Sequence, residues 1–133
     1  MLRRIAWSSC PSTSFSPARL GEIVAPARWN NKCNNVSGML LYTGVHFVEI
    51  LEGEEGVLDE MWSRLQHDDR HVSLVRIGDE ACDERRFAEW KMAYADDEAV
   101  GEQVEALRSS RPPLASSWST AINSIMARAA SLT

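Results

Sequence analysis

The feature that most constrains the fold is a pair of apolar runs, residues 36–42 and 45–52, joined by a Thr-Gly pair. Two such runs around a short glycine-containing connection predict an antiparallel hairpin. Alternation along the second run places Glu49 on the same face as Phe47 and Leu51. Neither face of this run is uniformly polar, so the strand resembles one that is covered on both sides.

Glu49 is the exception within this run. An unpaired carboxylate in an apolar interior is costly to desolvate, and buried glutamates are rare without a reason. A ligand or a polar partner beside Glu49 is therefore expected, and the residue types alone leave its identity open.

The flanking segments predict the order β-α-β-β-α-β-β. A strand is expected at residues 2–9, and a helix begins at Ser16-Pro17, where a hydroxyl can cap the helix and proline suits its first turn. Pro26 should disturb the last turns of this helix, which the asparagine-rich residues 30–35 close. The remaining expected elements are a turn at 53–56, a second helix ending near residue 67, and strands at 72–77 and around 90–94. This order predicts an α+β, ferredoxin-like fold with a five-stranded sheet.

The character of the chain changes after residue 96. The stretch EAVGEQVEALRSS reads as an exposed helix, Pro112-Pro113 breaks it, and residues 116–130 can form another. We therefore expect a domain at residues 1–96 and a C-terminal helical extension at residues 97–133.

Composition restricts the class of protein. A chain of 133 residues suits one globular unit, and its formal net charge of −5 argues against a nucleic-acid partner. No apolar run approaches the roughly 20 residues that span a bilayer, and the N-terminus lacks the apolar core of a secretory signal. The three cysteines show no paired metal-site spacing and fit reduced thiols in a cytoplasmic protein.

Three polar groups allow both a structural and a functional interpretation. Cys10, in a turn-rich stretch, is a nucleophile only if a base lies nearby, and a structural cysteine is the simpler interpretation. The run from Asp68 to His71 offers metal ligands, but Arg70 opposes a cation and favours an anionic ligand or a solvated junction. Asn30-Asn31 can end a helix, or can hydrogen-bond a ligand edge that alternates carbonyl and imide groups.

Several motifs occur together in one order. They are Trp7, Asn30-Asn31, Gly38-Met39-Leu40-Leu41-Tyr42, Gly44-x-x-Phe47-x-Glu49-x-Leu51-Glu52-Gly53, Asp68-x-Arg70-His71 and Arg86-Phe87-x-x-Trp90-x-Met92. On these residues the chain resembles the BLUF family, the blue-light sensing domains that use flavin, without a gap from about residue 3 to residue 95.

The resemblance implies a ferredoxin-like sheet whose two helices clasp the flavin on one face, with the C-terminal helices on the other face. It implies roles in binding the flavin ring or in signal transfer for a set of residues. Those at the flavin are Trp7, Ile23, Asn30, Asn31, Glu49, Leu65, Asp68, Arg70 and His71, and those of signal transfer are Trp90 and Met92.

Two positions depart from the family pattern. Family members carry tyrosine where this chain has Trp7 and glutamine where it has Glu49. In the family the tyrosine gives an electron and a proton to excited flavin, and the glutamine amide then rearranges its hydrogen bonds. The resemblance therefore implies that Glu49 occupies the flavin-facing glutamine position and that the photoswitch is altered or disabled.

The function expected from the sequence is a sensory one without enzymatic turnover. The expected cofactor is FAD, with FMN or riboflavin as alternatives, and the expected partners are a downstream protein and further copies of the chain, with no nucleic acid and no membrane. The rival interpretations are a flavin-free interaction or assembly module on the same fold, and an enzyme that uses the flavin or Cys10.

Overall fold

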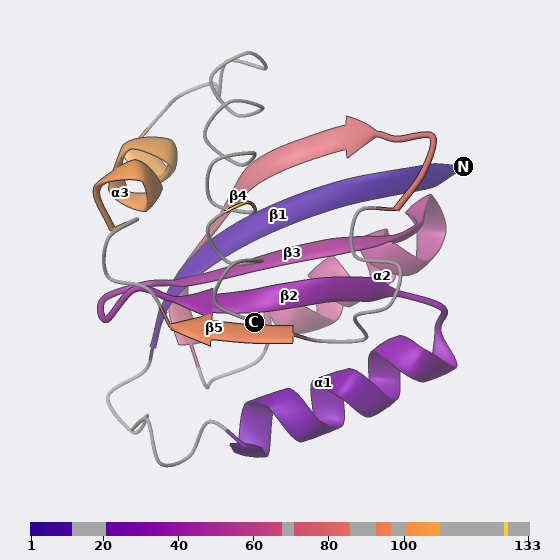
Figure 1. Ribbon diagram of the computed structural model, residues 1–133, viewed down its shortest axis with the longest axis horizontal. Helices are drawn as coiled ribbons and strands as arrows, with labels where there is room; N and C mark the ends of the chain where they lie inside the picture. Colours follow the sequence, from indigo (N-terminus) through magenta and orange to yellow (C-terminus); the bar gives the residue numbers. More distant parts are fainter. Residues whose placement is uncertain (12–20, 68–70, 86–92, 97–100, 110–126, 128–133) are drawn as a thin grey trace.

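Five strands form one sheet in the order β4-β1-β3-β2-β5 (Figure 1). This computed structural model describes residues 1–11, 21–67, 71–85, 93–96, 101–109 and 127. The elements are β1 (Leu2–Pro11), α1 (Gly21–Cys33), β2 (Ser37–Tyr42), β3 (Phe47–Glu54), α2 (Glu55–Leu65), β4 (His71–Ala81), β5 (Ala93–Asp96) and α3 (Gly101–Ser109).

The pairing of the strands is that of a ferredoxin-like sheet with one strand added. β1 pairs antiparallel with both β3 and β4, and β2 pairs antiparallel with β3. The added strand β5 pairs parallel with β2. The predicted α+β fold with five strands is therefore confirmed.

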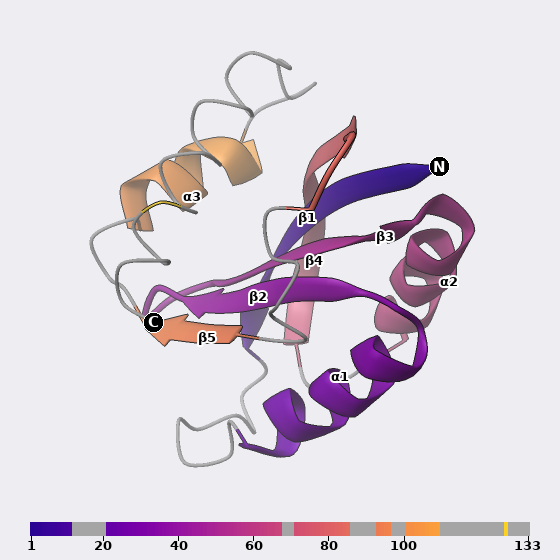
Figure 2. The same cartoon turned by 45° about the vertical axis from the view of Figure 1, so that its right-hand side comes forward.

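Helices cover both faces of the sheet. Side chains of α1 and α2 pack against a cluster built on one face around Ile5, Trp7 and Leu51. Helix α3 contacts the opposite face, where Arg108 reaches Ser8, the residue that follows Trp7 along β1. Figure 2 shows α1 and α2 on one side of the sheet and α3 on the other.

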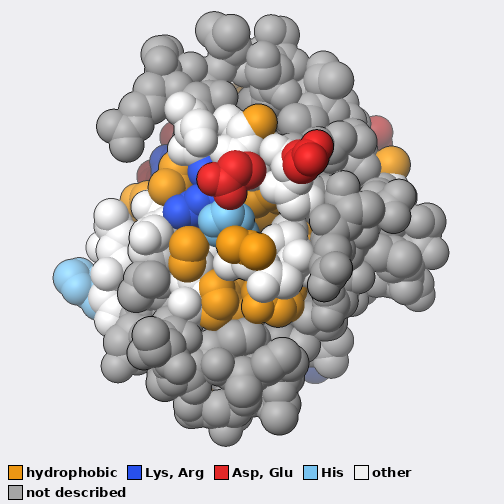
Figure 3. All heavy atoms as spheres, turned by 90° about the vertical axis from the view of Figure 1, so that its left-hand side faces the viewer, with side chains coloured by type: hydrophobic (Ala, Val, Ile, Leu, Met, Phe, Trp, Pro, Cys, Tyr) orange, Lys and Arg blue, Asp and Glu red, His pale blue; other side chains and the backbone are white. Residues whose placement is uncertain are grey.

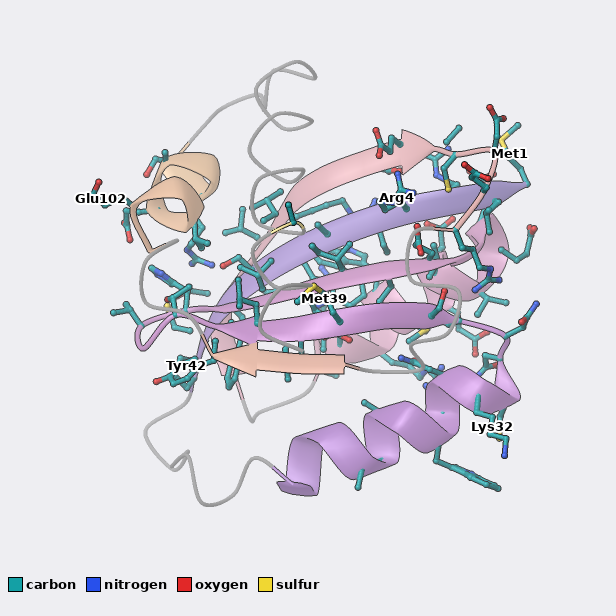
Figure 4. The ribbon with its side chains drawn as sticks, viewed as in Figure 1. Met1, Arg4, Lys32, Met39, Tyr42 and Glu102 are labelled. Atoms are coloured by element: carbon teal, nitrogen blue, oxygen red, sulfur yellow. The ribbon has the colours of Figure 1, made fainter. Side chains whose placement is uncertain are left out.

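The central hairpin is buried on both faces, as its apolar runs predict. Leu51 of the α1–α2 face and Val48 and Ile50 of the α3 face are all fully buried. A charged pair also lies inside: Arg4 donates to Glu52 from Nε at 2.8 Å and is 6% exposed, whereas Glu52 is 0% exposed. Figure 4 shows Arg4 on β1 beside β4 and Met39 at the centre of the sheet. Two oppositely charged groups can be buried together because each is the other's partner.

Helix α1 contains the exposed Pro26 and ends at Cys33, within the asparagine-rich stretch that was expected to close it. Two boundary expectations were wrong. The hairpin connection has four residues, 43–46, because the Thr43 hydroxyl accepts hydrogen bonds from the backbone of Val45 and His46 and so closes a longer turn. The expected turn at 53–56 is divided between β3 and α2, which follow each other directly.

One of the last two strands differs from expectation. β4 continues to Ala81, four residues beyond the predicted end at Ile77, because residues 78–81 keep pairing with β1. The described part of β5, residues 93–96, overlaps the strand expected around 90–94, of which residues 90–92 lie outside the described structure. The second C-terminal helix that we expect at 116–130 lies outside the described residues, except for helical Ala127.

Candidate functional site

Trp7 and Glu49 form a hydrogen-bonded pair on the α1–α2 face of the sheet. They are cross-strand partners in the β1–β3 ladder, so both side chains leave the same face. The indole Nε1–H of Trp7 donates to Oε2 of Glu49 at 3.1 Å. Trp7 is 2% exposed, whereas Glu49 is half-buried. The unusual carboxylate of the apolar run thus has the polar partner that its burial requires.

The two helices surround this pair with apolar side chains. Leu65, the last residue of α2, packs against the cluster that contains Trp7. Ala27 packs against the same cluster from α1. The backbone of Ile23 lies in α1, but its side chain is outside the described structure.

The two asparagines lie at the C-terminal end of α1 and differ in burial. Asn31 is completely buried, whereas Asn30 is half-buried and its Oδ1 accepts a hydrogen bond from Nδ2 of Asn34 at 3.1 Å. The residue with the left-handed conformation that ends the helix is Asn35, with φ 55°. Helix capping therefore explains Asn35 but does not explain the complete burial of the Asn31 amide.

The other predicted site residues are only partly described. The backbone of His71 begins β4, while Asp68 and Arg70 lie outside the described residues, as do Trp90 and Met92. Cys10 is half-buried inside β1, opposite Val72 of β4. The first half of the expected turn-rich stretch, up to Pro11, is therefore strand, and the remainder lies outside the described residues.

Two residues of this face were not predicted from the sequence. The ring of Trp62, on α2, lies 5.5 Å from the ring of Trp7 between centroids, at an interplanar angle of 46°. The guanidinium of Arg76, on β4, lies 4.6 Å from the centroid of the Trp62 ring. Helical spacing indicates which face of α2 carries Trp62, but it does not indicate which strand residue Trp62 contacts. Arg76 lies opposite Trp7 because of the register between β1 and β4, which the sequence does not reveal.

This set of residues fits a flavin ring. Buried Asn31 offers an amide that donates and accepts, which suits an edge of alternating carbonyl and imide groups. Aromatic and aliphatic side chains around Trp7 and Leu65 suit the apolar faces of the ring. Flavin would bring the absorption of blue light and an excited state that accepts an electron.

Helix α3 is attached to the other face of β1, directly behind Trp7. Arg108 donates to Oγ of Ser8 at 3.0 Å and to the carbonyl of Ser73 at 2.7 Å, and Ser73 has an unfavourable φ of 55°. His46 of the hairpin connection lies 3.7 Å from Glu105 of α3. Figure 3 shows acidic, basic and histidine side chains side by side at this end of the molecule.

The surroundings of His46 disfavour its charged form. Burial lowers its pKa below the ordinary 6.5, the positive charge of Arg108 lowers the pKa further, and Glu105 acts in the opposite direction. The attachment of α3 therefore favours a neutral imidazole at the hairpin.

The part of the chain that matches a known family contains strands β1 to β4 and the helices α1 and α2. Residues 2–93 match the model of the BLUF family, "Sensors of blue-light using FAD". A photoactivated adenylate cyclase subunit alpha-like protein FB of Euglena gracilis is 34% identical over 73 residues, which cover 55% of this chain and 7% of the relative. The blue light- and temperature-regulated antirepressor BluF of Escherichia coli (strain K12) is 31% identical over 78 residues, covering 59% of this chain and 19% of the relative. The matches thus span less than a fifth of these relatives.

Solved structures give the same result. The dark-state structure of the BLUF protein BlrB superposes with a TM-score of 0.69 at 27% identity, covering 80% of this chain and 81% of that one. A bacterial light-regulated adenylyl cyclase matches with a TM-score of 0.69 at 30% identity, over 72% of this chain and 28% of the other. The photo-activated BlsA structure, at 22% identity and a TM-score of 0.77, supports the fold alone. Among the described helices none is long and apolar enough to cross a membrane. The chain belongs to the BLUF family of blue-light sensors.

Proposed function

We propose that this chain is a flavin-binding blue-light sensory domain whose photoswitch is altered or disabled, and that its output passes through protein–protein contacts without substrate turnover. The observation that carries the proposal is the hydrogen bond from Trp7 to Glu49, on the face that α1 and α2 enclose. These are the two positions at which the family pattern has tyrosine and glutamine.

The Trp7–Glu49 pair has only one hydrogen-bond polarity. An indole N–H can only donate, so the oxygen of Glu49 that faces it must accept. A phenol and an amide can each donate or accept, which allows a tyrosine–glutamine pair two arrangements. A light-driven rearrangement needs a second stable arrangement, and in this pair Glu49 could supply a donor for it only when protonated.

The residues proposed to hold the flavin are those that the resemblance implies. Asn31 would hydrogen-bond the polar edge of the ring, with Asn30 beside it, and Leu65 and Ile23 would flank the ring from the two helices. Asp68, Arg70 and His71 would lie at the other side of the site. Bound flavin would supply the absorption of blue light and an excited state that accepts an electron, and Trp7 is the proposed donor of that electron.

The first experiment asks whether flavin is bound. Purified protein should be yellow, and denaturation should release FAD, which is the proposed cofactor, or else FMN or riboflavin. A colourless protein that also fails to take up added flavin would contradict the proposal.

The second experiment tests the altered switch. We expect quenched flavin fluorescence and no persistent red-shifted absorption after blue light, because an indole loses its proton far less readily than a phenol. The double substitution Trp7→Tyr with Glu49→Gln should recover a reversible red shift, whereas neither single substitution should recover it fully. A normal, reversible red shift in the unmodified protein would refute the disabled switch.

A flavin-free interaction or assembly module is the second candidate. It is favoured by the hydrogen bonds that Asn34 gives to Asn30 and Trp7 gives to Glu49, since these groups find partners within the protein. The colour of the purified protein separates the two candidates.

A further inference from the structure

Trp62 connects Trp7 to a fixed positive charge. Its ring is in contact with Trp7, at 5.5 Å between centroids, and the guanidinium of Arg76 lies 4.6 Å from its own centroid. Trp7 is buried, whereas Trp62 and Arg76 are half-buried. The three side chains therefore form a contact path from the interior of the site toward the surface.

The two indoles differ in how well their surroundings tolerate oxidation. Both rings have the same chemistry, so their environments decide which of them loses an electron more easily. An oxidised indole is a cation, and the guanidinium over Trp62, which stays protonated, repels it. Trp7 instead donates its N–H to an oxygen of Glu49, whose partial negative charge favours a positive ring.

We propose that Arg76 is a positioning residue that prevents Trp62 from reducing oxidised Trp7. The inference rests on the proposed function, in which Trp7 gives one electron to light-excited flavin. With Arg76 present, that electron returns to Trp7, and no net oxidation or reduction remains. Trp62 is kept out of the exchange by the charge above its ring.

Loss of the Arg76 charge opens a second route for the electron. Trp62 then gives an electron to oxidised Trp7, and the positive charge moves to half-buried Trp62. An added thiol reduces Trp62, and two oxidised thiols join as a disulfide with release of their protons. For each electron taken from a thiol, one electron stays with the flavin, so the visible absorption of the flavin decreases.

Two features limit the size of the effect. Asp79 Oδ2 lies 3.4 Å from Arg76 Nη1, and the Arg76 side chain is 30% exposed, so a carboxylate and solvent both screen the charge. We therefore expect about a tenfold change in bleaching rate, far less than an isolated buried charge would give.

The test uses flavin-loaded protein under blue light, without oxygen and with excess dithiothreitol, and measures the rate of flavin bleaching. Arg76→Met should bleach about tenfold faster, whereas Arg76→Lys, which keeps a cation, should retain the original rate. Arg3→Met is the matched control, because Arg3 also contacts Asp79 but makes no contact with an indole among the described residues. Adding Trp62→Phe to Arg76→Met should restore the slow rate. An unchanged rate in Arg76→Met, or equally fast bleaching in the double variant, would overturn the proposal.

A flavin-independent measurement separates this inference from the proposed function. Azide radicals generated by pulse radiolysis oxidise indoles in the apoprotein, and mass spectrometry then gives the ratio of damage at Trp62 to damage at Trp7. Exposed Trp29 provides the dose reference. Arg76→Met should raise the Trp62:Trp7 ratio about tenfold, and Arg76→Lys should leave it unchanged. An unchanged ratio in Arg76→Met contradicts the role of Arg76 even if the protein binds no flavin.

Discussion

At the scale of single residues, Asn31 is the most direct test of the flavin site. Its amide is completely buried at the end of α1, and a lost hydrogen bond to a buried ligand edge costs about 1–3 kcal/mol. We expect Asn31→Ala to weaken flavin binding by roughly five- to more than a hundredfold in fluorescence titrations. Cys10→Ala is the control, because Cys10 has no expected contact with the ring. Equal affinities in the two variants would remove Asn31 from the site.

A second residue-scale prediction concerns stability. Arg4→Met leaves the fully buried carboxylate of Glu52 without its Arg4 partner, and breaking a buried pair in this way costs about 3–5 kcal/mol. Urea unfolding measures the loss. Arg3→Met, which removes a more exposed partner of Asp79, should cost less than about 1 kcal/mol. Equal losses of unfolding free energy in the two variants would show that the burial of Glu52 does not determine the cost of removing its partner.

The sequence predicted one part of the site and missed another for a clear physical reason. Glu49 stood out because a charge inside an apolar run needs a partner, and the structure supplies Trp7. Trp62 and Arg76 did not stand out, since an aromatic residue on a helix and an arginine on a strand are ordinary. Their importance comes from contacts between α2, β1 and β4, which depend on strand register and helix position.

At the scale of elements, Arg108 contributes to the attachment of α3. Arg108 joins α3 to Ser8 of β1 and to Ser73 of β4. We expect Arg108→Ala to raise hydrogen exchange in residues 101–109 at least severalfold, because two hydrogen bonds of about 1 kcal/mol each are lost. Glu102→Ala, at an exposed position of the same helix, should leave exchange unchanged. Similar exchange in both variants would show that Arg108 does not hold α3.

The attachment of α3 should also depend on pH. Because the pKa of His46 is lowered in the folded protein, the unfolded chain binds more protons just below pH 6.5. The contribution of neutral His46 to the free energy of unfolding is fully present above pH 6.5. It is lost as the pH falls toward the lowered pKa of the folded state. His46→Gln should reduce the loss of unfolding free energy between about pH 7.5 and about pH 5.5 in urea titrations. Exposed His67→Gln should not, and equal pH dependence in both variants would contradict the role of His46.

The element order was predictable, whereas several boundaries were not. Hydrophobic periodicity gave all five strands and their order along the chain, because burial of one or both faces determines that pattern. The end of β4 was placed too early, since GDEACDERR looks like a polar connector although its first residues pair with β1. The end of α1 was predictable, because asparagine tolerates the backbone angles that end a helix.

At the scale of the whole molecule, we expect self-association. The expected C-terminal extension carries apolar residues that a second copy of the chain could help to bury, namely Leu107, Leu114, Trp118, Ile122 and Ile125. Light scattering should therefore detect a dimer or a larger assembly. A strict monomer at high concentration would contradict this expectation.

The two register shifts in the β1–β4 ladder decide how such an assembly can form. Trp7 and Ser8 lie between them, and each shift gives β4 one residue more than β1, so β4 follows a longer and more twisted path along the outside of the sheet. A strand bent in this way is a poor template for an incoming strand. At the opposite edge, the described part of β5 is four residues long. Pairing of strands between molecules is therefore disfavoured at both edges of the sheet. A second copy or a signalling partner is expected to dock against helices.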